Sequence, residues 1–292
     1  MKVSYDSLSN SFVSSDCECL LPQIMWHITD RCYLNCKTCF VKERKMSGEI
    51  VTFRKMLDNL PLLKQLGVQK IDLSGGDPLL FRELPDLVER VCQEGFYITI
   101  TTRGVGAESN RQWLFDNWMK FSRVIVSLDG GNVESCDFYS GYPGTYDYAV
   151  DTCRQLGKHG CDRLRINTVV NKCILDTRMK ADLIRVVLSL QPKEWCIIEP
   201  HPSNRASTFE QYAVTGKEYD CFLESILSAF NNEQTKVLQR RKTMYGTYWA
   251  LYPDNWICRL SEHSGTSFNV QLNRENMSMI VETLEQTNHL LP

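Results

Sequence analysis

Short apolar runs and longer amphipathic stretches alternate along residues 22–204 of this chain. The short runs are rich in β-branched and aromatic residues and predict six strands, at 24–28, 68–73, 96–101, 124–128, 164–170 and 195–198. Between them, apolar positions recur with the helical period and predict helices at 53–66, 84–93, 112–120, 146–158 and 178–190. Gly67, Gly95 and Gly160 follow three of these helices, at the position where a glycine commonly ends a helix.

This alternation amounts to about six β–α units and predicts an α/β fold with parallel strands joined by helical crossovers. In such folds, the loops that follow the strands meet on one face, and binding groups concentrate there. The pattern changes after residue 204. A helix is expected within 209–230, short strands at 236–238, 245–251 and 256–260, and a last helix within 272–291.

Three regions follow from this pattern. Residues 1–21 are polar and serine-rich and are expected to form an irregular lead-in, and 22–204 form the main α/β domain. Residues 205–292 are expected to form a small α+β cap that closes the domain.

Composition restricts the possible partners. The 292 residues are 43% hydrophobic, which suffices for a large core, and the formal net charge is −2 without any long basic run. We therefore expect no nucleic-acid partner. No apolar stretch reaches 18 residues and no signal-peptide pattern is present, so we expect no membrane association. Thirteen cysteines without a secretory signal favour a reducing, cytoplasmic location.

Cys32, Cys36 and Cys39 stand in one short segment directly after the strand expected at 24–28. Three thiolates in one loop suit three irons of a cubane cluster and leave the fourth iron open for a ligand. A zinc site or three unrelated thiols are the alternatives. The later cysteines are single and scattered, so the chain lacks the paired knuckle expected of a structural zinc site.

The Cys-x3-Cys-x2-Cys spacing resembles the radical S-adenosylmethionine (SAM) superfamily. Gly75-Gly76-Asp77-Pro78 is similar to the Gly-Gly-Glu-Pro turn that follows the second strand in that family. The resemblance implies a partial (β/α)6 barrel, a [4Fe-4S] cluster on Cys32, Cys36 and Cys39, and SAM on the open iron. It also implies reductive cleavage of SAM to a 5′-deoxyadenosyl radical that removes a substrate hydrogen, with a reductant such as flavodoxin or ferredoxin as partner.

The same resemblance suggests residues that hold SAM. Gly75 and Gly76 would let the backbone approach SAM closely, and Asp77 would accept a hydrogen bond from its ammonium group. Ser127 and Asp129 end the fourth strand and are expected on the SAM ribose. The alternative for this pair is a local capping or Asx-turn role.

Further candidates lie near these positions. Phe40 is expected near the adenine, although relatives carry an aromatic residue where this chain has Thr38. Arg165 and Asn167 share one face of their strand and are expected to point into the barrel. There they would bind an anion such as the SAM carboxylate or a substrate phosphate, unless Arg165 forms an internal ion pair. Arg103 stands where relatives carry Asn, which leaves its role open.

Two residues of the C-terminal region are candidate catalytic groups. Tyr248 belongs to a tyrosine-rich strand, and Cys258 is a candidate hydrogen-atom donor to a substrate radical. For both residues the alternative is ordinary packing in the core, where tyrosine and free cysteine are common.

The resemblance leaves the substrate open between a peptide, a sugar or another small molecule, and a nucleotide. Ser127-Leu-Asp129-Gly130 resembles segments of peptide-modifying relatives, and this favours peptide or natural-product maturation. Leu164-Arg-Ile-Asn167 and Thr247-Tyr248-Trp-Ala-Leu251 resemble viperins, which dehydrate nucleotides to ddh-nucleotides. A third possibility is an iron–sulfur binding module without catalysis.

Overall fold

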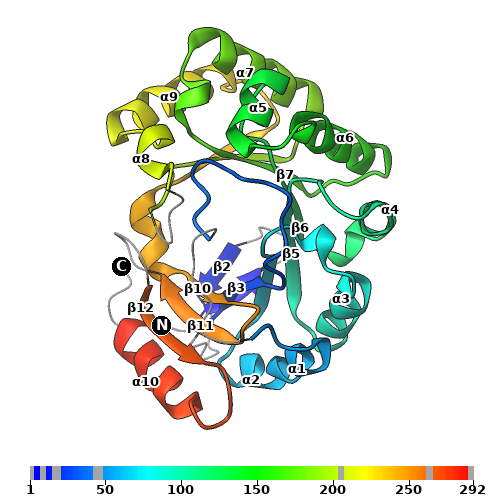
Figure 1. Ribbon diagram of the computed structural model, residues 1–292, viewed down its shortest axis with the longest axis vertical. Helices are drawn as coiled ribbons and strands as arrows, with labels where there is room; N and C mark the ends of the chain where they lie inside the picture. The colour runs from blue at the N-terminus through cyan, green and yellow to red at the C-terminus, as the bar shows by residue number, and fades with distance from the viewer. Residues whose placement is uncertain are drawn as a thin grey trace.

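The centre of the computed structural model is a single ten-stranded sheet curled into an open barrel (Figure 1). The structure describes residues 3–6, 11–14, 21–41, 49–202, 207–260 and 266–288. The strand order is β12-β11-β10-β3-β4-β5-β6-β7-β8-β9. Every neighbouring pair from β10 to β9 is parallel, whereas β11 and β12 run antiparallel. The outermost strands β12 and β9 do not pair, so the barrel is partial.

Six of these strands are the six expected from the sequence, with ends shifted by at most two residues. They are β3 (Gln23–His27), β4 (Lys70–Ser74), β5 (Tyr97–Thr102), β6 (Arg123–Ser127), β7 (Leu164–Val169) and β8 (Glu194–Ile198). The C-terminal region supplies β9 (Lys236–Arg240), β10 (Trp249–Leu251), β11 (Trp256–Leu260) and β12 (Thr266–Gln271).

Helices cover the outside of the curved sheet (Figure 1). They are α1 (Phe53–Leu57), α2 (Asn59–Gln65), α3 (Leu84–Gln93), α4 (Glu108–Asp116), α5 (Val133–Ser140), α6 (Thr145–Lys158), α7 (Thr177–Leu190), α8 (Phe209–Tyr212), α9 (Gly216–Ala229) and α10 (Met277–Asn288). The helix expected at 53–66 is two helices that meet at Asp58. This break places Pro61 in the first turn of α2, where its missing N–H removes no helical hydrogen bond.

Side chains on each strand alternate between the helical layer and the barrel interior. On β4, Ile71 and Leu73 are fully buried in the large core beneath the helices. Lys70, Asp72 and Ser74 take the other face by the two-residue period and line the interior. The interior is therefore largely polar, and the core that stabilises the fold lies outside the barrel wall.

The terminal regions differ from the sequence expectation in detail. Residues expected to be irregular include two strands that pair antiparallel, β1 (Val3–Asp6) and β2 (Ser11–Ser14). In the expected cap, β9 pairs with β8 and β10 pairs with β3, so this region extends both edges of the barrel sheet. The boundary at residue 204 stays a prediction. Within the described residues, no helix has the length and apolar character needed to cross a bilayer.

Candidate active site

The cysteine segment forms a loop at the carboxyl-terminal end of β3, where it is fastened to the end of α5. The backbone N–H of Asn35 donates to the Ser140 carbonyl at 2.7 Å, and that of Lys37 to the Tyr139 carbonyl at 3.0 Å, both at the end of α5. The buried Thr38 hydroxyl also hydrogen-bonds to the Tyr139 hydroxyl. Thr38 therefore anchors the loop, at the position where relatives carry an aromatic residue.

The three thiols of this loop are neighbours and none is in a disulfide. Cys32 is exposed, whereas Cys36 and Cys39 are half-buried. Desolvation, together with Cys36, Asp77 and Cys39, raises the pKa of Cys32. In the described part of the chain, no three His, Cys, Asp or Glu side chains stand ready to hold a metal ion. A cluster on these residues requires their thiols to lose their protons.

The glycine turn after β4 packs directly beneath the start of the cysteine loop. A Cβ on Gly76 would lie 2.0 Å from the Arg31 carbonyl oxygen, and one on Gly75 would lie 2.4 Å from that of Thr29. The N–H groups of Gly76 and Asp77 donate to the Thr29 and Arg31 carbonyls at 2.7 and 2.9 Å. These glycines allow two backbone segments to approach closely, and their expected contact with SAM stays a prediction.

Asp77 is buried and its carboxylate is engaged by the protein itself. Oδ1 accepts hydrogen bonds from the Leu79 N–H at 3.0 Å and the Thr102 hydroxyl at 2.7 Å, and Oδ2 accepts from the Arg103 N–H at 2.9 Å. Burial raises the pKa of Asp77 to about 6, against the lowering effect of these hydrogen bonds. The short side chain thus ties the glycine turn to the end of β5, and its expected bond to the SAM ammonium group stays a prediction.

Ser127 and Asn167 face each other at the carboxyl ends of β6 and β7. The two residues are paired in register, and Asn167 is 6% exposed. Its Oδ1 atom is buried without a hydrogen-bond partner among the described residues, which is rare unless a ligand or water completes the site. By contrast, Asp129 forms an ion pair with Arg103 and accepts from the Val169 N–H at 2.6 Å. Its expected role on the SAM ribose stays a prediction.

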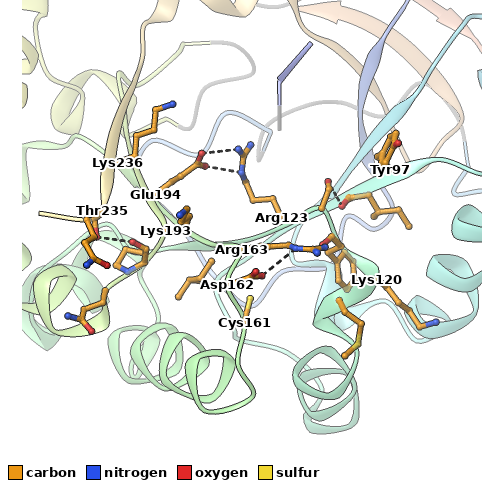
Figure 2. A pocket seen from close by; sticks show the side chains of 18 of the residues that line it. Tyr97, Lys120, Arg123, Cys161, Asp162, Arg163, Lys193, Glu194, Thr235 and Lys236 are labelled. Atoms are coloured by element: carbon orange, nitrogen blue, oxygen red, sulfur yellow. Dashed lines mark hydrogen bonds and ion pairs between the residues drawn. The ribbon is translucent and has the colours of Figure 1, made fainter. Parts of the chain in front are cut away.

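The barrel interior below these groups carries a cationic cluster, in which Lys70, Arg123 and Arg165 are buried and Arg240 is half-buried. Arg123 forms a two-point ion pair with Glu194, at 2.9 and 3.1 Å (Figure 2). Arg165 lies 3.6 Å from the same carboxylate, so the internal ion pair considered from the sequence is present. Burial and the three arginines lower the pKa of Lys70 to about 8, against the raising effect of Asp72. Burial is the largest cause of the lowered pKa, and repulsion by the three arginines adds to it.

A pocket of about 1160 Å³ opens at the amino-terminal end of the barrel, opposite the cysteine loop. Residues at the starts of β5 to β9 line it, including Tyr97, Arg123, Glu194 and Lys236 (Figure 2). The Arg123–Glu194 ion pair forms part of its wall, so this pocket lies next to the cationic cluster. The barrel interior is therefore lined by polar groups from the cysteine loop down to this opening.

The remaining candidates lie on the β3, β10 and β11 side of the barrel. Phe40 packs against an interior cluster of Met25, Ala250, Tyr252 and Cys258. Cys258 is fully buried, and its thiol donates to Asn269 Oδ1 at 2.6 Å. Tyr248 is half-buried, and the Arg240 guanidinium lies over its ring at 5.4 Å. The structure does not bring Arg165 to the cysteine loop, and the proposed roles of Phe40, Tyr248 and Cys258 stay predictions.

Several polar residues of the site were not singled out from the sequence. Lys70 and Arg123 fall on the interior face by the same two-residue strand period that places Arg165 and Asn167 there, so the sequence carries a signal for both. Tyr139 lies on α5, a helix that the sequence analysis missed because its residues show little helical periodicity. Arg103 was noticed only as a departure from relatives, since its contacts come from three separate segments.

Residues 26–177 match the radical SAM superfamily. The chain belongs to the radical SAM superfamily. This membership confirms the family, the partial barrel, and the [4Fe-4S] cluster and SAM as the family's cofactors. The thiol triplet and the unpartnered Asn167 oxygen at the same end of the barrel fit that pair of cofactors.

Similar sequences include two that are named S-adenosylmethionine-dependent nucleotide dehydratase. The one from Lacinutrix mariniflava is 24% identical over 85% of this chain and 52% of its own length, and the one from Flammeovirga pacifica is 25% identical over 69% and 71%. A probable GTP 3′,8-cyclase from Archaeoglobus fulgidus is 29% identical over 49% of this chain and 47% of its own length. The chain thus spans about half the length of two of these relatives.

Similar solved structures share the fold. Streptococcus suis SuiB bound to S-adenosylmethionine superposes with a TM-score of 0.66 at 13% identity, over 81% of this chain and 59% of that one. A histidine-tagged anSMEcpe with bound AdoMet superposes with a TM-score of 0.64 at 15% identity, over 82% and 74%. At these identities the likeness establishes the radical SAM barrel alone.

Proposed function

We propose that this radical SAM protein acts on a nucleotide, as a dehydratase of the kind that two of its sequence relatives are named for. The observation that carries the proposal is the gathering of four cations in the barrel, Lys70, Arg123, Arg165 and Arg240, close enough for the arginines to add to the effect of burial on the pKa of the lysine. Like charges that meet in a poorly solvated interior repel one another. Glu194 and Asp72 offset part of this repulsion, and a bound polyphosphate would offset the remainder.

The spacing along β7 fits a nucleotide that spans the interior. Arg165 and Asn167 point the same way two residues apart, about 7 Å along the strand. Asn167 lies at the carboxyl-terminal level, near the cysteine loop, and Arg165 lies deeper with Arg123 and Glu194. A nucleoside at the upper level would therefore place its phosphates among the arginines, which bind phosphate oxygens through paired N–H groups.

The chain's own residues have separate tasks in this proposal. Cys32, Cys36 and Cys39 would hold the cluster, which supplies the electron for reductive cleavage of SAM when it is bound. Ser127 and Asn167 would orient SAM, and the arginines would fix the substrate by its phosphates. The barrel sheet separates the interior from the helices, and its outward-facing Ile71 and Leu73 are fully buried. This packed layer would exclude water from the reacting groups. Tyr248 and Cys258 are the proposed hydrogen donors.

The test is anaerobic reconstitution with iron, sulfide, SAM and dithionite, followed by measurement of 5′-deoxyadenosine with and without each nucleoside triphosphate. We expect 5′-deoxyadenosine formation to rise strongly with one nucleotide and a dehydrated nucleotide to accumulate. Cleavage that no nucleotide stimulates would overturn the nucleotide assignment and favour a peptide, sugar or other small molecule. A full cluster without any SAM cleavage would favour a non-catalytic iron–sulfur module.

A binding experiment tests the cationic cluster directly. We expect Arg165→Gln to weaken binding of the stimulating nucleotide at least about tenfold while SAM binding changes little, because Arg165 lies below the SAM level and a charge-assisted contact is lost. The matched control is Arg90→Gln, since Arg90 is exposed on α3 and contacts Gln93 and Glu94 on the surface. Equal loss of nucleotide and SAM affinity in Arg165→Gln would contradict this placement.

A further inference from the structure

Arg103 is a buried arginine that joins three separate segments beneath the cysteine loop. It follows β5 directly and is only 9% exposed. Its backbone N–H donates to Asp77, and its Nη2 atom forms an ion pair with Asp129, which is 1% exposed. Asp129 at the end of β6 thus holds the guanidinium, while the Arg103 backbone is fixed to the glycine turn through Asp77.

The guanidinium of Arg103 also lies against the cysteine loop. The Tyr139 ring, which anchors that loop, is 5.8 Å from the guanidinium carbon. Among the groups around the guanidinium, the Cys36 side chain is the one whose charge acts on it most strongly. Nη1 is buried and makes no hydrogen bond to a side chain or carbonyl of the described residues, so one donor of a fixed cation remains available beside Cys36.

We propose that Arg103 is a positioning residue that donates to the Cys36 thiolate in the assembled cluster and makes that cluster easier to reduce. The inference rests on the proposed function, because it requires Cys36 to be a cluster ligand. Reduction adds a negative charge to the cluster. A fixed positive charge at a ligand sulfur stabilises the reduced state, and hydrogen bonds to cluster sulfurs and net charge both control the potential.

Asp129 opposes this effect through the same ion pair. Its carboxylate neutralises part of the Arg103 charge and places a negative charge near the cluster. Because the pair is buried, each charge acts through a medium of low dielectric constant and is little screened. The midpoint potential should therefore become more negative when Arg103 is lost and less negative when the Asp129 charge is lost. General damage to the site would shift the potential in the same direction in both variants.

The experiment is a redox titration of the reconstituted protein without SAM or substrate, followed by the electron paramagnetic resonance signal of the reduced cluster. We expect Arg103→Gln to shift the midpoint potential to a more negative value, and Arg103→Lys to shift it less because the charge remains. Asp129→Asn should shift the potential to a less negative value. Asn keeps an oxygen that can accept from the Val169 N–H.

The matched control is Arg111→Gln. Arg111 is as buried as Arg103, but it lies on α4 and pairs with Glu108 and Asp151 in the outer layer. We expect its potential to equal that of the unaltered protein. A shift of the same size in this control would overturn the proposal, because it would reflect loss of a buried arginine anywhere in the fold.

The remaining outcomes separate the two proposals. An unchanged potential in Arg103→Gln would overturn the role of Arg103 while leaving the radical SAM assignment intact. If Arg103→Gln holds no cluster, Asp129→Asn decides: a less negative potential supports the proposal and an unchanged one overturns it. An unaltered protein that assembles no cluster would overturn the proposed function and this inference together.

Discussion

At the scale of single residues, the site depends on polar side chains that the protein itself holds in place. Asp77 accepts three hydrogen bonds from the chain, and Asp129 is bound by Arg103 and Val169. By contrast, Asn167 retains an unpartnered oxygen in the described part of the barrel. The residues that are already satisfied shape the site, and those with unused hydrogen-bonding capacity are the best candidates to contact a ligand.

The first residue-level prediction concerns the cysteine loop. Cys36→Ala should abolish incorporation of the cluster and cleavage of SAM together, because two thiolates leave the cluster without a required ligand. Iron and sulfide content after anaerobic reconstitution, and 5′-deoxyadenosine formation, measure the two effects. Cys221→Ala is the control, since Cys221 is exposed on α9. A Cys36→Ala protein that still cleaves SAM would remove Cys36 from the cluster.

The second residue-level prediction concerns the buried carboxyl group of Asp77. Its pKa is raised to about 6 in the folded protein, above the value in the unfolded chain, so the folded state binds the extra proton. Stability from this group is therefore present at low pH and is lost as the pH rises through 6. Lowering the pH from about 7 to about 5 should stabilise the unaltered apoprotein by about 1 kcal/mol relative to Asp77→Asn. Urea unfolding at both pH values measures this difference, and a difference that does not change with pH would contradict it.

At the scale of elements, close contact between two backbone segments positions the cysteine loop. The turn after β4 and the loop after β3 follow adjacent parallel strands, which brings their carboxyl ends together. The glycines of the turn then allow the two segments to hydrogen-bond. The sequence predicted both strands and the glycine turn, and the family resemblance assigned the glycines to SAM, which stays a prediction. The contact between the two loops could not be predicted, because it depends on strand order.

The element-level prediction compares two glycines. Gly76→Ala should destabilise the fold by about 2 kcal/mol, because the added carbon overlaps the Arg31 carbonyl group. It should also lower cluster content, since the clash displaces the segment that leads into Cys32. Gly157→Ala is the control, because Gly157 lies in α6 with open space around it, and alanine there should stabilise the helix by about 1 kcal/mol. Urea unfolding compares the two, and a Gly76→Ala protein of unchanged stability would contradict the packing argument.

At the scale of the whole molecule, the curled sheet turns one face of every strand into a shared interior. That interior gathers Lys70 from β4, Arg123 from β6, Arg165 from β7 and Arg240 from β9. These residues are far apart in the chain, and each would be an ordinary surface cation on a flat, solvated sheet. The barrel brings them close enough for their charges to act on one another.

The molecule-level prediction is proton uptake when a nucleotide binds. The pKa of Lys70 is lowered to about 8 by burial and by the neighbouring arginines, so Lys70 is partly deprotonated near that pH. Phosphates bound nearby would raise this pKa, and the protein should take up about half a proton per nucleotide at about pH 8. Calorimetry in two buffers of different ionisation enthalpy measures the uptake. Lys70→Gln should abolish it, and uptake that persists in this variant would assign the proton to another group.

The sequence by itself determined the β–α alternation, the six strands of the barrel wall and the cysteine triplet, because these depend on local periodicity and on short spacing. It also determined the family, through motifs whose residues are neighbours in the chain. Only the tertiary structure decided which buried charges meet. Arg103 lies beside Cys36 and Asp129, and Arg123 pairs with Glu194, because parallel strands bring their equivalent ends together over long separations in sequence. Such contacts leave no periodic signal in the chain, since they depend on strand order and on the curl of the sheet.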